Sequence, residues 1–158
     1  MKSKYHDILF TEPVTVWSSE FDTPTIRVND KMYKLILKEP KAFVGKDGTN
    51  AYVFGRMFKR DSYKKIATIV NDVANVGLMD INFAPEFSTE DVSLFDIYED
   101  HEWDDREILK EARRIFPDLL FNGRTIRGDV GATLYAHYDK SGDIDSLIID
   151  SSYFFPSE

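Results

Sequence analysis

Hydrophobic and polar residues alternate along much of the first third of the chain, with the period of two that is typical of β-strands. Residues 12–20 follow this pattern, and residues 25–28 and 31–39 flank a short polar turn, which predicts a β-hairpin. Residues 51–58 predict a further strand, in which Gly55 marks a bulge or a close approach of two backbones. We therefore expect an antiparallel sheet over this part of the chain.

In the middle of the chain the hydrophobic residues are spaced three and four positions apart, which predicts amphipathic helices. The first helix is capped by Asp61 or Ser62 and runs through Asn75. Two more are predicted at residues 88–98 and 104–116, because each of these segments begins with the spacing of a capping box. These two helices have acidic outer faces and apolar inner ones.

The remaining segments complete the predicted sheet. Residues 78–83 predict a strand, and residues 131–139 and 143–155 predict a hairpin around a polar loop. The expected order is four strands, one helix, one strand, two helices and two strands. This order predicts one α+β domain over residues 1–158, a mostly antiparallel β-sheet with about three helices packed on one face.

The composition supports a folded protein without covalent cross-links. The chain has 158 residues, of which 42% are hydrophobic and 30% are charged, enough for one hydrophobic core. It contains no cysteine, which excludes disulfides, thiolate zinc sites and a cysteine nucleophile. The apolar run Ile8–Phe10 is too short for a secretion signal, and no later run approaches the length of a membrane span. We expect a soluble, cytoplasmic protein.

Charge is distributed unevenly along the chain. Residues 24–65 contain eleven lysines and arginines against four acids, a net charge of plus seven. Residues 86–107 contain ten carboxylates against one arginine, a net charge of minus nine in a chain whose total is minus eight. The two regions are either solvated faces that attract one another across the fold, or surfaces that attract other molecules.

The acidic region contains the candidate binding site. Trp103 lies among carboxylates, and a large apolar ring with a charged rim is typical of an anchor at a protein interface. The same residue equally fits a side chain that folds the turn between the two acidic helices back onto the core. The candidate partner-binding residues are Glu99, Asp100, Glu102, Trp103, Asp104 and Asp105.

Motifs for metal binding or catalysis are weak. Residues 139–145 place oxygen-bearing side chains at alternate positions, but glycine is fourth and position twelve is Asp150, so a polar hairpin turn is favoured over a calcium loop. His6, His101 and His137 are isolated in sequence, and we expect His137 to be a hydrogen-bonded strand residue, not a base or a metal ligand. No cofactor and no metal is predicted.

These observations favour a binding protein over an enzyme. We expect an inhibitor or immunity-type protein, with virus-encoded inhibitors as one analogy, that docks an acidic helical surface on a protein with a basic surface. If that partner binds nucleic acid, the carboxylates imitate phosphates. No membrane partner is expected.

Two other functions stay open from the sequence. The first is a metal-dependent hydrolase or nuclease that uses Asp30, Glu39 and Asp143. The second is a structural subunit of a virus particle or other assembly, in which opposed charged faces pair head to tail. Nucleic-acid binding by the basic region 24–65 also stays open.

Overall fold

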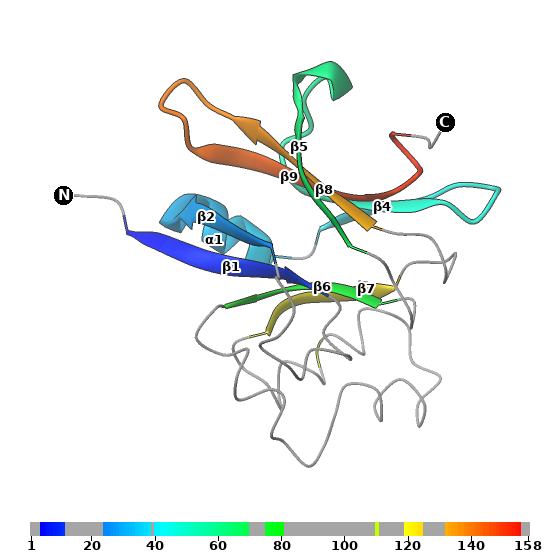
Figure 1. Cartoon of the computed structure of the whole chain (residues 1–158), viewed down its shortest axis with the longest axis horizontal. Coiled ribbons are helices and arrows are strands. Elements are labelled where there is room, and N and C mark those ends of the chain that lie inside the picture. The colour runs from blue at the N-terminus through cyan, green and yellow to red at the C-terminus, as the bar shows by residue number, and fades with distance from the viewer. Residues whose placement is uncertain are drawn as a thin grey trace, which may run out of the picture.

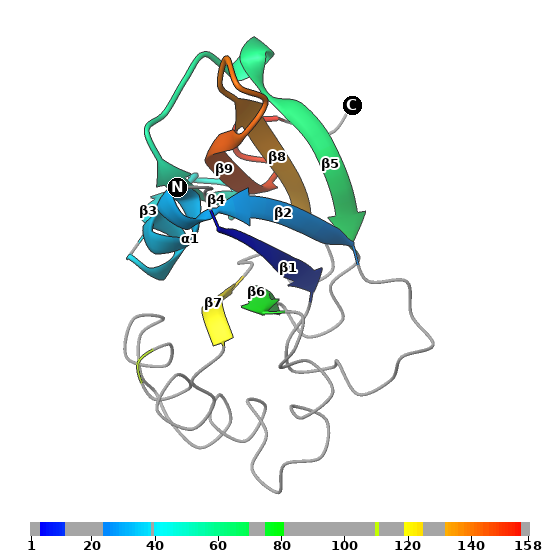
Figure 2. The same cartoon turned by 90° about the vertical axis from the view of Figure 1, so that its left-hand side faces the viewer.

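The described part of the chain forms two antiparallel β-sheets and one α-helix (Figure 1). In a computed structural model, the residues whose placement is described are 4–11, 24–38, 40–69, 75–80, 110, 119–124 and 132–155. The two sheets lie one above the other in Figure 1, and the turned view in Figure 2 shows the helix at one side of them.

The first sheet has four strands in the order β2-β1-β6-β7. Strand β1 (Tyr5–Thr11) pairs with β2 (Thr25–Asn29) on one side and with β6 (Asn75–Asp80) on the other. Strand β7 (Leu119–Arg124) pairs with β6 across a register shift. All three pairings are antiparallel, and the paired strands come from segments that are far apart in the sequence.

The second sheet has five strands in the order β3-β4-β9-β8-β5. Strand β9 (Ile144–Ser151) lies at its centre, and seven of its eight residues are buried. Its neighbours are β4 (Asn50–Gly55) and β8 (Ala132–Tyr138), while β3 (Lys41–Val44) and β5 (Lys64–Ile69) form the two edges. The short 3₁₀ turn η2 (Arg60–Ser62) precedes β5.

One hydrophobic core joins the two sheets. Ile8 and Phe10 of β1 belong to the same buried cluster as Phe54 of β4 and Leu147 of β9. Helix α1 (Asp30–Leu37) directly follows β2 and packs against strands of both sheets. Burial of large side chains is the main favourable term in folding, so the packing between the sheets is the main source of stability.

Helix α1 begins where β2 ends because Asn29 is a helix cap. The Asn29 side-chain oxygen accepts a hydrogen bond from the backbone N–H of Met32 at 2.9 Å. Met32 and Ile36, four positions apart, are buried, while Lys31 and Lys34 face solvent. Residues 31–39 were expected to form a strand, and this prediction is wrong because the cap and the three-four spacing favour a helix.

The expected fold, with about three helices on one face of the sheet, is wrong as well. The described residues form two sheets, and α1 is the one helix of seven or more residues among them. The helix expected to run through Asn75 is replaced by η2 and β5, whose β-branched Ile66, Thr68 and Ile69 suit a strand.

Other parts of the prediction fare differently. Residues 119–124 form β7, a strand that was not expected. The strand expected at residues 51–58 is confirmed over residues 51–55, in β4, and the hairpin of the last section is confirmed as β8 and β9. The strand expected at residues 78–83 begins earlier, at Asn75 of β6, and residues 81–83 lie outside the described part of the chain. The strand expected at residues 12–20 and the two acidic helices lie outside the described residues, apart from Lys110. The single domain over residues 1–158 stays a prediction.

A smaller hydrophobic cluster covers the outer face of the five-stranded sheet. The chain folds back after β9, so that Tyr153, Phe154 and Phe155 pack beside Val53 and Ile148. The carboxylate of Asp150, which is 2% exposed, accepts hydrogen bonds from the backbone N–H groups of Phe154 at 2.8 Å and Phe155 at 3.2 Å. Burial raises the pKa of Asp150, although these N–H groups partly oppose the rise.

This buried carboxylate predicts a specific pH dependence of stability. Because the pKa of Asp150 is raised in the folded state, ionisation of its carboxyl group opposes folding. The free energy of unfolding should therefore fall as the pH rises from about 3.8 through the folded-state pKa. Asp150→Asn removes this ionisation, so the wild type should lose free energy of unfolding relative to the variant as the pH rises from acid to neutral.

Urea unfolding at several pH values between 4 and 7 measures this difference. Asp61→Asn, which alters an exposed carboxylate beside η2, is the control and should follow the wild-type profile. Parallel profiles for wild type and Asp150→Asn would show that the buried carboxylate does not titrate in this range.

Candidate functional site

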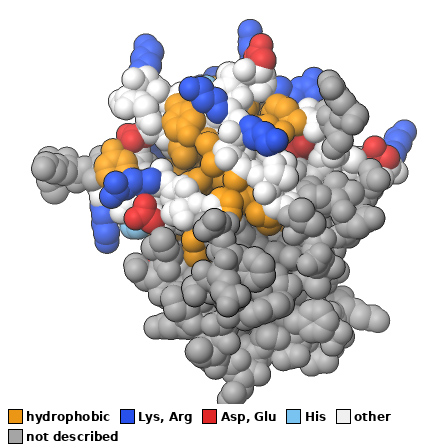
Figure 3. Space-filling model, viewed as in Figure 1, with side chains coloured by type: hydrophobic (Ala, Val, Ile, Leu, Met, Phe, Trp, Pro, Cys, Tyr) orange, Lys and Arg blue, Asp and Glu red, His pale blue; other side chains and the backbone are white. Residues whose placement is uncertain are grey.

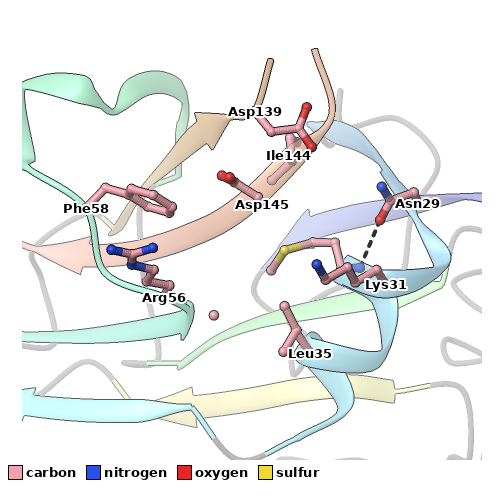
Figure 4. Close-up of a pocket in the computed structure, with 10 residues that line it drawn as sticks. Asn29, Lys31, Leu35, Arg56, Phe58, Asp139, Ile144 and Asp145 are labelled. Atoms are coloured by element: carbon pink, nitrogen blue, oxygen red, sulfur yellow. Dashed lines mark hydrogen bonds between the residues drawn. The ribbon is translucent and has the colours of Figure 1, made fainter. Parts of the chain in front are cut away.

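A cleft of about 660 Å³ lies between helix α1, the segment after β4 and the β8–β9 hairpin (Figure 4). This volume lies within the range of small-molecule sites. Its walls come from three parts of the chain that are distant in sequence. The lining residues are Asn29, Lys31, Met32, Leu35, Gly55, Arg56, Phe58, Asp139, Ile144 and Asp145.

Two cations lie on opposite sides of the cleft. Figure 4 shows Lys31 on α1 and Arg56 on the segment that follows β4, with Asp139 and Asp145 of the hairpin along another wall. Within the described residues, neither cation forms an ion pair with a carboxylate. The Arg56 guanidinium carbon lies 5.4 Å from the centre of the Phe58 ring, within the range of a cation–π contact.

Gly55 allows the segment after β4 to pack closely against the β8–β9 hairpin. Its φ is +84°, in the left-handed region that other residues rarely adopt. A Cβ at this position would lie 2.9 Å from the backbone carbonyl oxygen of Asp145. The prediction of a close backbone approach at Gly55 is thus confirmed, and the turn it makes directs Arg56 and Phe58 over the hairpin.

A hydrogen-bonded aromatic stack lies behind the cleft. The imidazole of His137 is 2.6 Å, Nδ1 to Oδ1, from the Asp145 carboxylate, and its ring stacks on Phe58 with centroids 3.7 Å apart. The hydroxyl of Tyr63 accepts a hydrogen bond from the Phe58 backbone N–H at 3.1 Å and bonds Ser146 at 2.8 Å. These contacts fix the Phe58 ring from several directions.

His137 is therefore the hydrogen-bonded strand residue that the sequence predicted. Asp145 lines the cleft, whereas His137 is not among the lining residues. A histidine that acts as a general base must itself reach the proton that it removes. In this arrangement the carboxylate faces the cleft and the imidazole holds the carboxylate, so the pair serves to position Asp145.

A second histidine–aspartate pair lies at the start of β1. His6 Nε2 is 2.6 Å from Oδ1 of Asp30, the first residue of α1, and the His6 ring stacks on Tyr33 with centroids 3.9 Å apart. The neighbouring Tyr5 donates a hydrogen bond from its hydroxyl to Asp143 at 3.1 Å. That hydrogen bond and the negative charge of Asp143 raise the pKa of Tyr5.

The acids proposed for a metal-dependent enzyme are not brought together in the cleft. Asp30 and Asp143 form separate hydrogen bonds and neither lines the cleft, while Glu39 lies outside the described residues. Within the described segments, no group of three or more histidine, aspartate or glutamate side chains is placed to hold a metal ion.

The loop at residues 139–145 has the geometry of a polar hairpin turn. The Asp139 carboxylate accepts hydrogen bonds from the backbone N–H groups of Ser141 at 2.8 Å and Asp143 at 3.1 Å. Gly142, with a φ of +86°, donates its N–H to the Asp139 carbonyl at 3.1 Å. One carboxylate oxygen thus organises the loop, as is typical of aspartate in turns.

The six predicted partner-binding residues, from Glu99 to Asp105, lie outside the described residues. The described residues contain fifteen lysines and arginines against nine aspartates and no glutamate, a net charge of plus six. Figure 3 shows lysine and arginine side chains spread over the described part of one face, with hydrophobic side chains between them. We call the described residues the basic framework.

Most cations of the basic framework have no acidic partner within it. One lysine or arginine pairs with a carboxylate in the described segments, Arg27 with Asp7 at 3.8 Å, and both side chains are exposed. Lys34, Lys38 and Lys59 form no ion pair with a described acid. Exposed pairs contribute little to stability, so this framework does not depend on them.

The sequence did not single out the two cations or the aromatic ring of the cleft. Lys31 fell in an expected strand, and Arg56 and Phe58 fell at the end of another. The available signal was Gly55 itself, since a glycine inside a strand often marks a place where a ligand or another backbone approaches closely. Within the described residues no helix has the length and apolar character needed to cross a membrane.

Comparison with known proteins finds a viral relative. The chain is 37% identical over 164 residues to a protein of Acanthamoeba polyphaga mimivirus titled "Uncharacterized protein R816", and the alignment covers 95% of this chain and 79% of that protein. No protein-family model matches the chain, and no solved structure matches it.

The geometry of the cleft predicts unequal effects for two glycine substitutions. Gly55→Ala should lower the free energy of unfolding by more than Gly142→Ala, although both residues have similar positive φ values. Each variant incurs the left-handed cost of about 1 kcal/mol. Only at Gly55 does the added Cβ also meet a backbone atom, whereas nothing lies within 4 Å at Gly142.

Urea unfolding of both variants measures the difference. We expect Gly55→Ala to lose at least about 1 kcal/mol more than Gly142→Ala, because a backbone carbonyl cannot move aside without disturbing the β4–β9 pairing. Equal losses would mean that the close approach of Gly55 to Asp145 is not required for stability.

Proposed function

The chain belongs to the same family as the mimivirus protein R816, and from this premise we propose that it is a virus-encoded binding protein that recognises its partner by charge. In this proposal the acidic region, residues 86–107, contacts the basic surface of another protein and inhibits or masks it. The partner is a protein whose basic surface normally contacts nucleic acid, so that the carboxylates take the place of phosphates.

The observation that carries the proposal is the division of charge within the chain. The whole chain has a net charge of minus eight and the basic framework has plus six, so the remaining segments together carry minus fourteen. A concentration of charge of this size produces a long-range field, which raises the rate of encounter with an oppositely charged surface and disfavours partners of like charge.

Trp103 supplies the apolar part of the proposed contact. Charged residues at the rim of an interface mainly affect the association rate, whereas a buried aromatic residue contributes more of the binding energy. Asp100, Glu102, Asp104 and Asp105 surround Trp103 in the sequence, which is the composition of an anchor with a charged rim.

Comparative capture of binding partners tests the proposal. The wild-type chain and the variant Asp100→Asn/Glu102→Gln/Asp104→Asn/Asp105→Asn serve as baits in a lysate of the cells in which the protein is made, followed by mass spectrometry. A matched control neutralises four acids far from the acidic region in sequence, and therefore has the same net charge. Its substitutions are Glu12→Gln, Glu20→Gln, Asp22→Asn and Glu158→Gln.

A true partner should be retained by the wild type and by the matched control, and lost from the site variant. With the purified partner, the site variant should associate at least about tenfold more slowly at low salt, and the difference should shrink as salt increases. If every captured protein responds equally to the two neutralised variants, binding follows net charge alone and the proposed site is wrong.

A second candidate function is assembly of identical copies. The observation that favours it is the basic framework itself, whose exposed cations have almost no carboxylate partners within the described segments. The acidic region of one copy complements this surface on the next copy, and contacts of this head-to-tail type build rings or filaments.

Sedimentation velocity at about 50 mM and 500 mM salt separates the two functions. Assembly predicts large species at low salt that dissociate at high salt, and it predicts that Lys34→Ala/Lys38→Ala/Lys59→Ala weakens them as much as neutralising the acidic region does. If the size of the species is independent of concentration and salt, charge-driven assembly is ruled out and the binding-protein proposal stands.

A further inference from the structure

We propose that the cleft between α1 and the β8–β9 hairpin binds a phosphate monoester with an organic body of about mononucleotide size. Arg56 and Lys31 hold the phosphate group, and the apolar wall of the cleft holds the rest of the ligand. None of the residues given for its lining belongs to the acidic region in the sequence, and the inference does not depend on the proposed function.

The hydrogen bonds around the cleft indicate the charge of the ligand. The carboxylates already have partners, since Asp145 bonds His137 at 2.6 Å and Asp139 accepts two backbone N–H groups. The two cations have no carboxylate partner within the described residues. Arg56 and Lys31 are therefore charged hydrogen-bond donors in the cleft that are still available, and such donors bind an anion.

Arg56 has the features of a preorganised phosphate-binding residue. Its guanidinium group presents several N–H donors in one plane, which match the oxygens of a phosphate in a bidentate contact. The group lies 5.4 Å from the centre of Phe58, and that ring is held by the stack on His137. Because the supporting ring is fixed, less conformational entropy is lost when Arg56 engages a ligand.

Lys31 adds positive charge where the backbone already provides some. It lies in the first turn of α1, and the N-terminal end of a helix has a partial positive charge. A lysine at this position is unfavourable for the helix end, although Asp30 in the same turn offsets part of the positive charge. An anion in the cleft relieves this repulsion and interacts favourably with both the ammonium group and the helix end.

The remaining wall explains why the ligand is larger than a phosphate ion. Met32 and Ile144 are 1% and 5% exposed, and together with Leu35 they form an apolar surface within the cleft. A free phosphate would leave this surface and most of the 660 Å³ volume unused. An ester with a sugar or ring system covers the apolar wall and gains the corresponding burial energy.

Isothermal titration calorimetry with adenosine monophosphate, inorganic phosphate and adenosine tests the site on the full chain. Adenosine monophosphate should bind more tightly than either of its parts. Arg56→Ala and Lys31→Ala should each weaken its binding by about tenfold or more, as expected for the loss of a charged hydrogen-bond donor. Arg56→Lys, which keeps the charge but loses the planar group, should give an intermediate loss.

Lys34→Ala is the matched control, because Lys34 lies on the same helix, is exposed and does not line the cleft. Its binding should equal that of the wild type. Arg56 and Lys31 are also exposed, so the urea concentration at the midpoint of unfolding should be the same for their alanine variants as for the wild type. Absence of binding by the wild type, or equal weakening by Lys34→Ala, would overturn the proposal.

An oligonucleotide with a 5′-phosphate, compared with the same oligonucleotide without it, separates the two sources of a phosphate monoester. Binding of adenosine monophosphate alone identifies a free nucleotide as the ligand. Binding that also requires the 5′-phosphate identifies a chain end, and the proposed chemistry still holds. Equal binding of both oligonucleotides, unaffected by Arg56→Ala, would assign recognition to the exposed lysines and overturn the proposed site.

Discussion

The pairing of β9 with β4 and β8 is the interaction on which the rest of the structure depends. Strand β9 is buried along almost its whole length, and its inner side chains belong to the core that joins the two sheets. Near its start, Asp145 and Ser146 support the cleft through their hydrogen bonds to His137 and Tyr63. Near its other end, Asp150 holds the aromatic residues 153–155 on the outer face of the sheet. One strand therefore supports the core, the site and the outer cluster.

The sequence predicts segments well where local chemistry and tertiary packing agree. The β8–β9 hairpin is such a case, because alternating strands flank a loop whose aspartate and glycine have turn-specific roles. Prediction from the sequence fails where one pattern of residues fits both a strand and a helix. Residues 31–37 alternate as a strand does, but they also place Met32 and Ile36 four apart, and the Asn29 cap decides for a helix. In β5, a bulge between Lys65 and Ala67 disturbs the strand period.

The cleft could not be predicted for a different reason. Lys31, Arg56 and Asp145 belong to a helix, a loop and a strand, and no spacing rule connects residues so far apart. Charge blocks, by contrast, are visible in the sequence, which is why the acidic region drew the functional prediction. The structure describes all the cations of residues 24–65, and Arg27 is the one among them that pairs with a described carboxylate.

The two consecutive residues at the start of β1 connect the opposite walls of the cleft. Tyr5 is hydrogen-bonded to Asp143 in the β8–β9 hairpin, and His6 is hydrogen-bonded to Asp30 at the first turn of α1. The helix and the hairpin therefore cannot separate unless one of these hydrogen bonds breaks. Neither Tyr5 nor His6 lines the cleft, so a substitution at either position would loosen the hold between the helix and the hairpin without removing a lining side chain.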